Sequence, residues 1–145
     1  MFEQLLIGSG VICGTVVIHV LFINVLVHLL TKYSDWIVAP PQMVRRTIVL
    51  IAMVLWLVAG LSVSSWLWAG IYLINGVFED LEPALYFAVV TFTTLGYGDI
   101  IVGPDWRLLA SLTAVNGLII VGLNTAFLFE ALSRINKAQA VNNDG

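Results

Sequence analysis

Charge is scarce in this sequence of 145 residues. Asp, Glu, Lys and Arg make up only 10% of it, whereas 60% of the residues are hydrophobic and the mean hydropathy is +1.00. A soluble domain of this length needs more polar side chains to cover its surface. The scarcity of charge excludes a soluble globular protein and predicts an integral membrane protein surrounded by lipids.

Basic clusters and cysteine pairs are also missing. The net charge is -3 and no run of Lys or Arg occurs, so the sequence gives no reason to expect binding to nucleic acid or a switch on a charged lipid surface. The single cysteine, Cys13, excludes an intrachain disulfide. Because Cys13 lies within an apolar segment, we expect it to be a small buried side chain.

Patterns typical of enzymes are absent as well. The sequence contains no cluster of residues with metal-ligand spacing, no nucleophile paired with a base, and no glycine-rich phosphate loop with its lysine. We therefore expect no enzymatic activity and no resident cofactor.

Three apolar runs are long enough to cross a bilayer as helices, which takes roughly 20 residues. The charged segment between the first two runs contains Pro40 and Pro41, which predict a short loop. The runs cover residues 5–30, 47–72 and 106–132.

Aromatic residues stand near the ends of these runs. Trp66, Trp68 and Tyr72 lie near the end of the second run, where an aromatic belt at the membrane surface is expected. The other tryptophans are expected at the interface or in packing contacts, and these are Trp36, Trp56 and Trp106.

A shorter apolar stretch, residues 85–93, lies between the second and third runs. It is too short to cross, and an apolar helix held at membrane depth requires protein or a wet cavity around it, so we expect a re-entrant helix. Pro83 suits the first turn of this helix. Three acidic residues stand at its positive end, Glu79, Asp80 and Glu82.

The short helix leads into the sequence Thr-Thr-Leu-Gly-Tyr-Gly-Asp, residues 93–99. Gly96 and Gly98 have no Cβ and can adopt positive φ, which turns alternate peptide units the same way, and Thr94 can add its hydroxyl oxygen. A row of backbone carbonyls facing one axis can replace the water around a dehydrated ion. An ordinary turn between two helices is the alternative for this segment.

Residues from about 45 to 134 resemble the pore domain of the potassium channel family, with an outer helix, a pore helix, a filter and an inner helix. The resemblance implies a filter formed by Thr94, Leu95, Gly96, Tyr97 and Gly98. It implies that the carbonyls of Thr94, Leu95, Gly96 and Tyr97 bind K⁺, which is a permeant ion rather than a cofactor.

The resemblance also implies roles outside the filter itself. Gly117 and Gly122 correspond to a gating hinge in the inner helix. The inner-helix residues that correspond to the cavity lining are Leu118, Val121 and Thr125. The residues that support the filter are Thr93, Asp99, Tyr86 and Val90.

The sequence departs from the family pattern at two of these positions. Leu95 replaces the commoner valine or isoleucine, which keeps the carbonyl and changes the packing behind it. Val90 stands where some relatives carry a glutamate that hydrogen-bonds to the filter aspartate. Asp99 then needs another partner, and we expect Tyr86 to fill this role.

Charge placement predicts the orientation of the chain. If the filter opens outward, five of the six basic residues lie on the cytoplasmic side, as expected for a membrane protein. The N-terminus is then extracellular or periplasmic, the C-terminus is cytoplasmic, and the outer mouth is acidic. The minimal architecture suggests a prokaryotic inner membrane.

The first predicted helix carries polar residues within the membrane, where polar side chains are costly. His19 is expected either to hydrogen-bond in neutral form to a neighbouring helix or to act as a pH sensor. Gly10 and Gly14 form a small-xxx-small pair that permits close helix approach. The helix has no repeated arginines, which excludes a voltage sensor. In the third run, Ser111, Asn116 and Asn124 are expected to hydrogen-bond between subunits, and contact with the ion is the alternative for Asn124.

Together these features predict an all-α membrane protein with three transmembrane helices, a re-entrant pore helix and a filter loop. One filter segment cannot surround an ion, so we expect a fourfold-symmetric homotetramer. The expected parts are residues 1–44 (first helix and cytoplasmic loop), 45–136 (pore domain) and 137–145 (short polar tail). The expected function is a potassium-selective channel, and the alternatives are a weakly selective cation channel and a non-conducting regulatory subunit.

Overall fold

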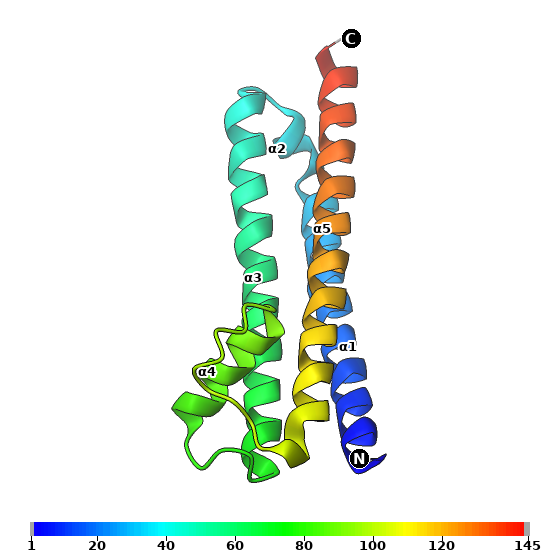
Figure 1. Ribbon diagram of the computed structural model, residues 1–145. Helices are drawn as coiled ribbons and strands as arrows, with labels where there is room; N and C mark the ends of the chain where they lie inside the picture. The colour runs from blue at the N-terminus through cyan, green and yellow to red at the C-terminus, as the bar shows by residue number, and fades with distance from the viewer. Residues whose placement is uncertain (1, 144–145) are drawn as a thin grey trace.

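The computed structural model describes residues 2–143, and within that range every regular element is a helix. Figure 1 shows the long helices side by side with a shorter helix at one end. The elements in order are α1 (Phe2–Lys32), α2 (Ser34–Val38), α3 (Gln42–Ile74), α4 (Leu81–Phe92), the 3₁₀ turn η1 (Pro104–Trp106) and α5 (Arg107–Asn143).

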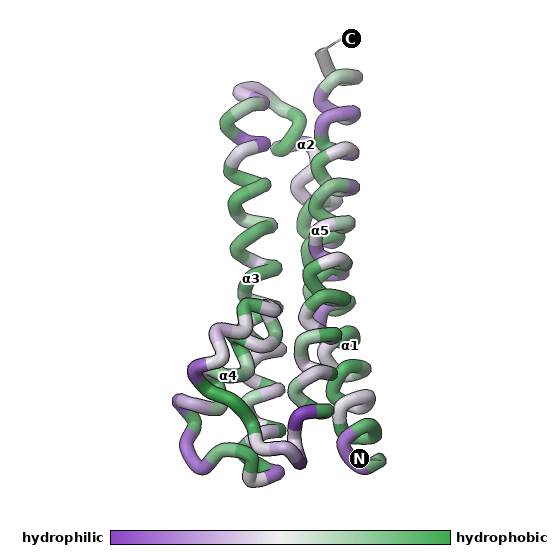
Figure 2. Tube along the Cα trace, viewed as in Figure 1, coloured by the Kyte–Doolittle hydropathy of each residue, from purple (hydrophilic) through white to green (hydrophobic). Residues whose placement is uncertain are grey.

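Three of the helical segments are long and apolar enough to cross a membrane: Phe2–Lys32, Gln42–Ile74 and Pro104–Ala140. Figure 2 shows hydrophobic residues along their length, with hydrophilic residues concentrated in the connections and at the ends. The prediction of three spans is confirmed, and the chain is a multi-pass membrane protein.

The helices extend beyond the predicted runs because polar helix formers continue each apolar run. The expected polar tail is helical as far as Asn143, and residues 144–145 lie outside the described part. The expected loop between the first two runs contains the short helix α2. Pro40 and Pro41 still separate α2 from α3, as predicted.

α1 and α5 run in the same direction and α3 runs the opposite way (Figure 1). The N-terminus therefore lies at the end that holds α4, and the C-terminus lies at the other end. The chain leaves α3, passes through α4 toward the middle of the bundle, and returns along an extended loop to the start of α5 (Figure 1). This path places residues 93–99 beside the bundle, between α4 and α5.

Two apolar clusters form the core, one at each end. The cluster beside α4 contains Trp68 and Tyr72, which are both 0% exposed. The prediction of an aromatic belt is wrong for these two residues, because they face α4 and α5 and pack with rings such as Phe87, whose centroid lies 5.3 Å from that of Tyr72. Trp66 on another face of α3 is exposed.

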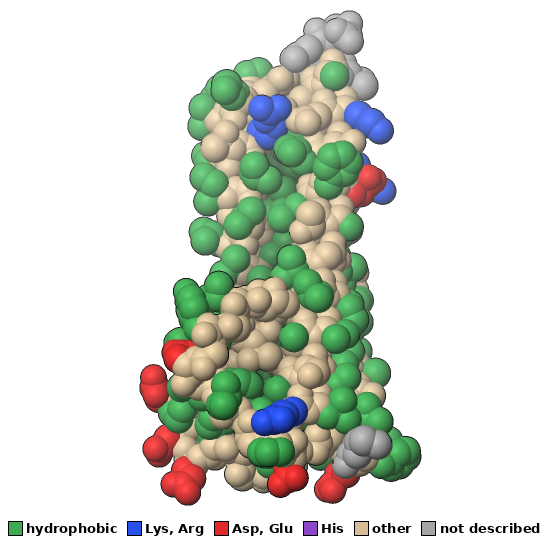
Figure 3. All heavy atoms as spheres, viewed as in Figure 1, with side chains coloured by type: hydrophobic (Ala, Val, Ile, Leu, Met, Phe, Trp, Pro, Cys, Tyr) green, Lys and Arg blue, Asp and Glu red, His purple; other side chains and the backbone are tan. Residues whose placement is uncertain are grey.

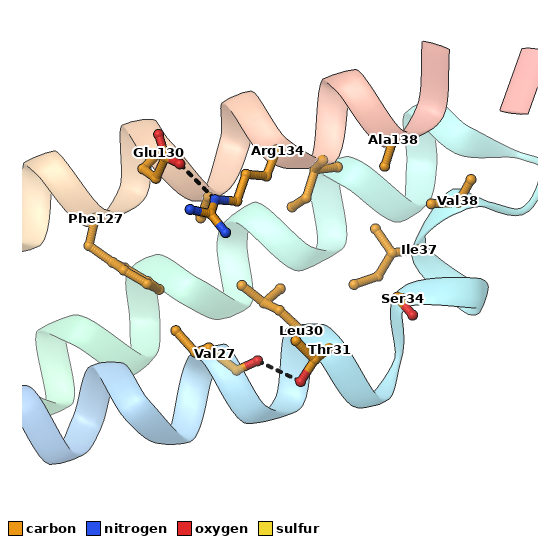
Figure 4. Close-up of a pocket in the computed structure, with 12 residues that line it drawn as sticks. Val27, Leu30, Thr31, Ser34, Ile37, Val38, Phe127, Glu130, Arg134 and Ala138 are labelled. Carbon is orange, nitrogen blue, oxygen red and sulfur yellow. Dashed lines mark hydrogen bonds and ion pairs between the residues drawn. The ribbon is translucent and has the colours of Figure 1, made fainter. Parts of the chain in front are cut away.

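The second cluster lies near α2 and borders a groove of about 510 Å³. Figure 4 shows this groove between α1, α2 and α5, with the ion pair between Glu130 and Arg134 (2.6 Å) on the α5 side. Its lining is mostly apolar and includes Leu30, Ile37 and Phe127. None of the predicted filter or cavity residues lines it.

Candidate functional site

The carbonyl end of α4 holds the start of the candidate filter by hydrogen bonds. The N–H of Thr93 donates to the carbonyl of Val89 at 2.9 Å, and that of Thr94 donates to Thr91 at 3.0 Å. The carbonyl of Val90 accepts from the N–H groups of both Leu95 (2.9 Å) and Gly96 (3.2 Å). The loop is therefore fixed directly to the last turn of α4.

The backbone then alternates in the sign of φ. Thr94, Gly96 and Gly98 have φ of 59°, 54° and 77°, whereas Leu95 and Tyr97 between them do not have positive φ. Thr94 is the one non-glycine residue with positive φ among the described residues, and such a conformation is uncommon for a side chain with a branched Cβ. The alternation is the backbone pattern that the two glycines predict for a row of carbonyls facing one side.

The loop lies open on the surface of a single chain. Leu95 is 56% exposed and Tyr97 is 69% exposed. Backbone polar groups in a membrane protein require partners inside protein or a wet cavity. One chain by itself does not enclose this segment.

Asp99 at the end of the loop accepts a hydrogen bond from the hydroxyl of Tyr86 at 2.6 Å, as predicted. This hydrogen bond lowers the pKa of the Asp99 carboxyl and raises the pKa of the Tyr86 hydroxyl. The side chain of Val90 is buried, so the residue in the position of the family's glutamate packs in the core and supports the loop through its carbonyl.

The predicted cavity residues lie together on one exposed face of α5. Leu118 is 62% exposed, Val121 is 45% exposed and Thr125 is also exposed. The hydroxyl of Thr125 donates to the carbonyl of Val121 at 2.8 Å. This face is opposite the side of α5 that packs on α1 and α3, which includes Asn116 and Ile120.

The two predicted hinge glycines have different surroundings. A Cβ on Gly117 would overlap the carbonyl of Phe92 at the end of α4, with the carbonyl carbon at 2.6 Å. A Cβ on Gly122 would meet nothing within 4 Å. Gly117 is therefore required for the close approach of α4 and α5, while a hinge role for either glycine stays a prediction.

α1 is joined to the rest of the chain by buried polar contacts. The side-chain amide of Asn116 donates to the hydroxyl of Thr15 at 2.7 Å, and both residues are 0% exposed. His19, also 0% exposed, has its Nδ1 3.0 Å from the carbonyl of Thr15 and 3.4 Å from the hydroxyl of Ser64 on α3. The expectation that His19 contacts a neighbouring helix is confirmed, and the pH-sensor alternative stays untested.

Among the polar residues on α5, the predicted partner is wrong for Asn116, and hydrogen bonding between subunits stays untested for Ser111 and Asn124. Asn116 bonds to α1 of its own chain, Ser111 bonds to the carbonyl of Arg107 at 2.9 Å, and the buried amide of Asn124 has no hydrogen-bond partner. Asn116 is turned toward its own chain because α1 packs on that side of α5, whereas the side chain of Ser111 is exposed.

Two predictions about small residues on α1 are also corrected. Nothing lies within 4 Å of a Cβ built on Gly10 or Gly14, and the close approach to α5 occurs instead at Gly8, where a Cβ would overlap the side chain of Leu112. Cys13 is exposed rather than buried because it faces away from the other helices.

The hydrogen bond between Tyr72 and Thr113 was not predicted from the sequence. The two hydroxyl oxygens lie 2.6 Å apart, and the hydroxyl of Thr113 also lies 3.2 Å from the carbonyl of Leu109. A tyrosine at the end of an apolar run gives no signal that distinguishes a buried hydroxyl from a membrane-surface one.

Charged side chains separate along the molecule. Figure 3 shows acidic side chains gathered at the end that holds α4, and most of the Lys and Arg side chains toward the end with the C-terminus. This distribution matches the asymmetry counted from the sequence.

Part of the chain is similar in sequence to a known protein. The chain is 34% identical over 59 residues to a Rhodopseudomonas palustris protein named "Putative potassium channel protein". The aligned stretch is 40% of this chain and 14% of the length of that protein. No solved structure matches the chain.

A family model described as "Ion channel" matches residues 47–134. The match covers more than half of the chain and includes α4, the loop 93–99 and most of α3 and α5. α1 and α2 lie outside it. The chain belongs to this ion channel family.

Proposed function

We propose that four copies of this chain form a potassium-selective channel. The observation that carries the proposal is the alternation of positive φ at Thr94, Gly96 and Gly98, immediately after the carbonyl end of α4. Together with the family membership, this backbone supports a carbonyl-lined filter better than an ordinary turn.

In this channel, K⁺ ions lose water and occupy successive rings of oxygens from residues 94–97 of the four subunits. Repulsion between ions moves them down their electrochemical gradient. The exposure of the loop in a single chain supports the tetramer, because three further copies would cover it. The exposed face of α5 with Leu118, Val121 and Thr125 would line the cavity below.

α4 would enter and leave the membrane from the same side, with its negative end directed at the cavity. The acidic end of the molecule would form the outer mouth, and the N-terminus would lie on that side. The C-terminus and α2 would be cytoplasmic, in a prokaryotic inner membrane. Lipids and the other three copies are the partners that this arrangement requires.

The experiment compares Gly96→Ala with Gly76→Ala in liposome flux and bi-ionic reversal potentials. Both glycines have positive φ (54° and 67°) and nothing within 4 Å of an added Cβ, but Gly76 lies outside the filter. We expect Gly96→Ala to abolish K⁺ conduction, because an alanine resists this φ by about 1–2 kcal/mol and turns the carbonyl away. Gly76→Ala should conduct as the wild type does.

Other outcomes identify the alternatives. Near-equal Na⁺ and K⁺ permeability of the wild type would indicate a weakly selective cation channel, in which Leu95 and Val90 let the filter widen. A silent wild-type tetramer would indicate a regulatory subunit. Wild-type currents from Gly96→Ala would remove the loop from the mechanism.

A further inference from the structure

A short segment of α5, residues 113–117, contacts three other helices through specific atoms. Thr113 bonds to Tyr72 of α3, Asn116 bonds to Thr15 of α1, and Gly117 lies against the carbonyl of Phe92 at the end of α4. The residues that contact α1 and α4 are adjacent in the sequence. α1 and the filter-bearing helix therefore meet α5 at the same level.

The contact with α1 is specific. The amide nitrogen of Asn116 lies 2.7 Å from the Thr15 hydroxyl oxygen, and the Thr15 hydroxyl lies within 3.0 Å of the amide oxygen. Both side chains are 0% exposed. The Thr15 hydroxyl also lies 2.8 Å from the carbonyl of Ile12, whereas the buried amide of Asn116 would find no substitute for Thr15 in lipid or water. Gly8 brings α1 close to Leu112 two turns earlier, which fixes the spacing of the same helix pair.

From these contacts we propose that Thr15 is a positioning residue for the filter, acting through Asn116 and Gly117. Thr15 holds α5 at the height at which Gly117 seats the end of α4. Phe92 directly precedes Thr93, and the carbonyls of the same turn bind the N–H groups of Thr94 to Gly96. Because packed interiors transmit displacements rather than absorbing them, a shift of α5 moves these carbonyls.

This inference rests on the proposed function only where it predicts a change in ion selectivity. α1 lies outside the part of the chain that matches the ion channel family, which begins at residue 47. The role therefore belongs to the helix that this chain adds to the family domain. It explains why a membrane helix would carry a fully buried threonine opposite a buried asparagine.

The test replaces Thr15 by valine, which keeps the shape and removes the hydroxyl. Thr15→Ser keeps the hydroxyl and serves as the rescue variant. Thr31→Val is the matched control, because the Thr31 hydroxyl is on the same helix and bonds only to that helix, at Val27 and His28. In Thr15→Val, the amide of Asn116 is buried without a partner, and this cost can prevent folding. The double variant T15V/N116L removes both polar groups and so provides a folded protein in that case.

Two measurements are made on the purified full chain in liposomes. Amide hydrogen exchange of residues 93–99 should rise about fivefold or more in Thr15→Val and in the double variant, with residues 126–135 unchanged as an internal reference. The ratio of K⁺ to Na⁺ permeability should fall by a similar factor. Thr15→Ser and Thr31→Val should match the wild type in both measurements.

The outcomes separate this inference from the proposed function. A silent wild-type protein whose filter segment still exchanges faster in Thr15→Val would overturn the channel proposal and support the positioning role. A conducting protein in which Thr15→Val leaves both exchange and selectivity unchanged would overturn the positioning role. Exchange that rises equally throughout the bundle would also overturn it, because that result means a general loss of stability.

Discussion

The two ends of the helix bundle are held together in different ways. At the end with α4, α5 makes individual polar contacts with its neighbours, such as Tyr72 to Thr113 and Thr15 to Asn116. At the other end, α1, α2 and α5 enclose an apolar groove of about 510 Å³, and α5 contacts α2 through Gln139, which donates to the carbonyl of Ile37 at 3.0 Å.

The difference indicates where this chain needs one fixed geometry. Apolar packing tolerates several arrangements of similar energy, whereas buried polar pairs permit few. Buried pairs of polar side chains occur on the segment of α5 that contacts the end of α4, whereas at the groove end the buried Gln139 bonds to a backbone carbonyl beside an open apolar space. Substitutions at the two ends of the bundle test this contrast.

Gly117→Ala should have the largest effect. The added Cβ meets the backbone of Phe92, which cannot rotate away, so we expect a loss of about 3 kcal/mol or more in the free energy of unfolding. Gly122→Ala is the control, with nothing within 4 Å of its Cβ. Thermal unfolding in detergent measures both. Equal stability of the two variants would mean that α4 and α5 are not closely packed at Gly117.

Tyr72→Phe should lower the free energy of unfolding by about 1 kcal/mol, since it removes one buried hydrogen bond within the membrane. Ser62→Ala on the same helix is the control, because the Ser62 hydroxyl is exposed and bonds only to Val58. The same unfolding assay is used. If Tyr72→Phe is as stable as Ser62→Ala, the Thr113 contact contributes nothing.

Tyr86→Phe should change the response of the filter to acid. The Tyr86 hydroxyl lowers the pKa of Asp99, so ionised Asp99 supports the loop above its unfolded pKa and this support is lost as pH falls through the lower folded value. Without the hydroxyl the pKa rises toward its ordinary range. The loss of K⁺ flux on acidifying the outer solution should then begin at a higher pH.

The control for this change is Tyr33→Phe, a tyrosine at the opposite end of the molecule, which should leave the acid response unaltered. An unchanged midpoint in Tyr86→Phe would show that the Asp99 contact does not support the loop.

Ala138→Leu should have the smallest effect. Ala138 lines the groove, so the larger leucine side chain has space to enter it. We expect stabilisation by about 0.5 kcal/mol. The same change at Ala88, which is 0% exposed in α4, should instead cost about 1–3 kcal/mol. Similar costs at both positions would mean that the two ends are equally well packed.

The long helices could be predicted from the sequence because lipid requires apolar runs of nearly fixed length. Their ends could not, since polar helix formers such as those after residue 136 continue a helix beyond the apolar part. α2 was missed because five helical residues beside two prolines resemble a loop. Pro83 was correctly predicted to lie in the first turn of α4, which begins at Leu81.

Contacts at the candidate site were predictable where a local pattern determines them. Two glycines in a short motif require positive φ, and Asp99 needed a donor that only a few nearby residues could supply. The partner of Asn116 was not predictable, because Thr15 is 101 residues away. Nor could the direction of Trp68 and Tyr72 be predicted, since residue type does not show which face of a helix is covered.

The long separation of Thr15 and Asn116 has a consequence for synthesis of the protein. α1 emerges from the ribosome 101 residues before its partner and must wait in the membrane with a polar side chain exposed. The Thr15 hydroxyl lies 2.8 Å from the carbonyl of Ile12 in its own helix, which satisfies it during this interval. A threonine at this position therefore allows α1 to insert early and dock late.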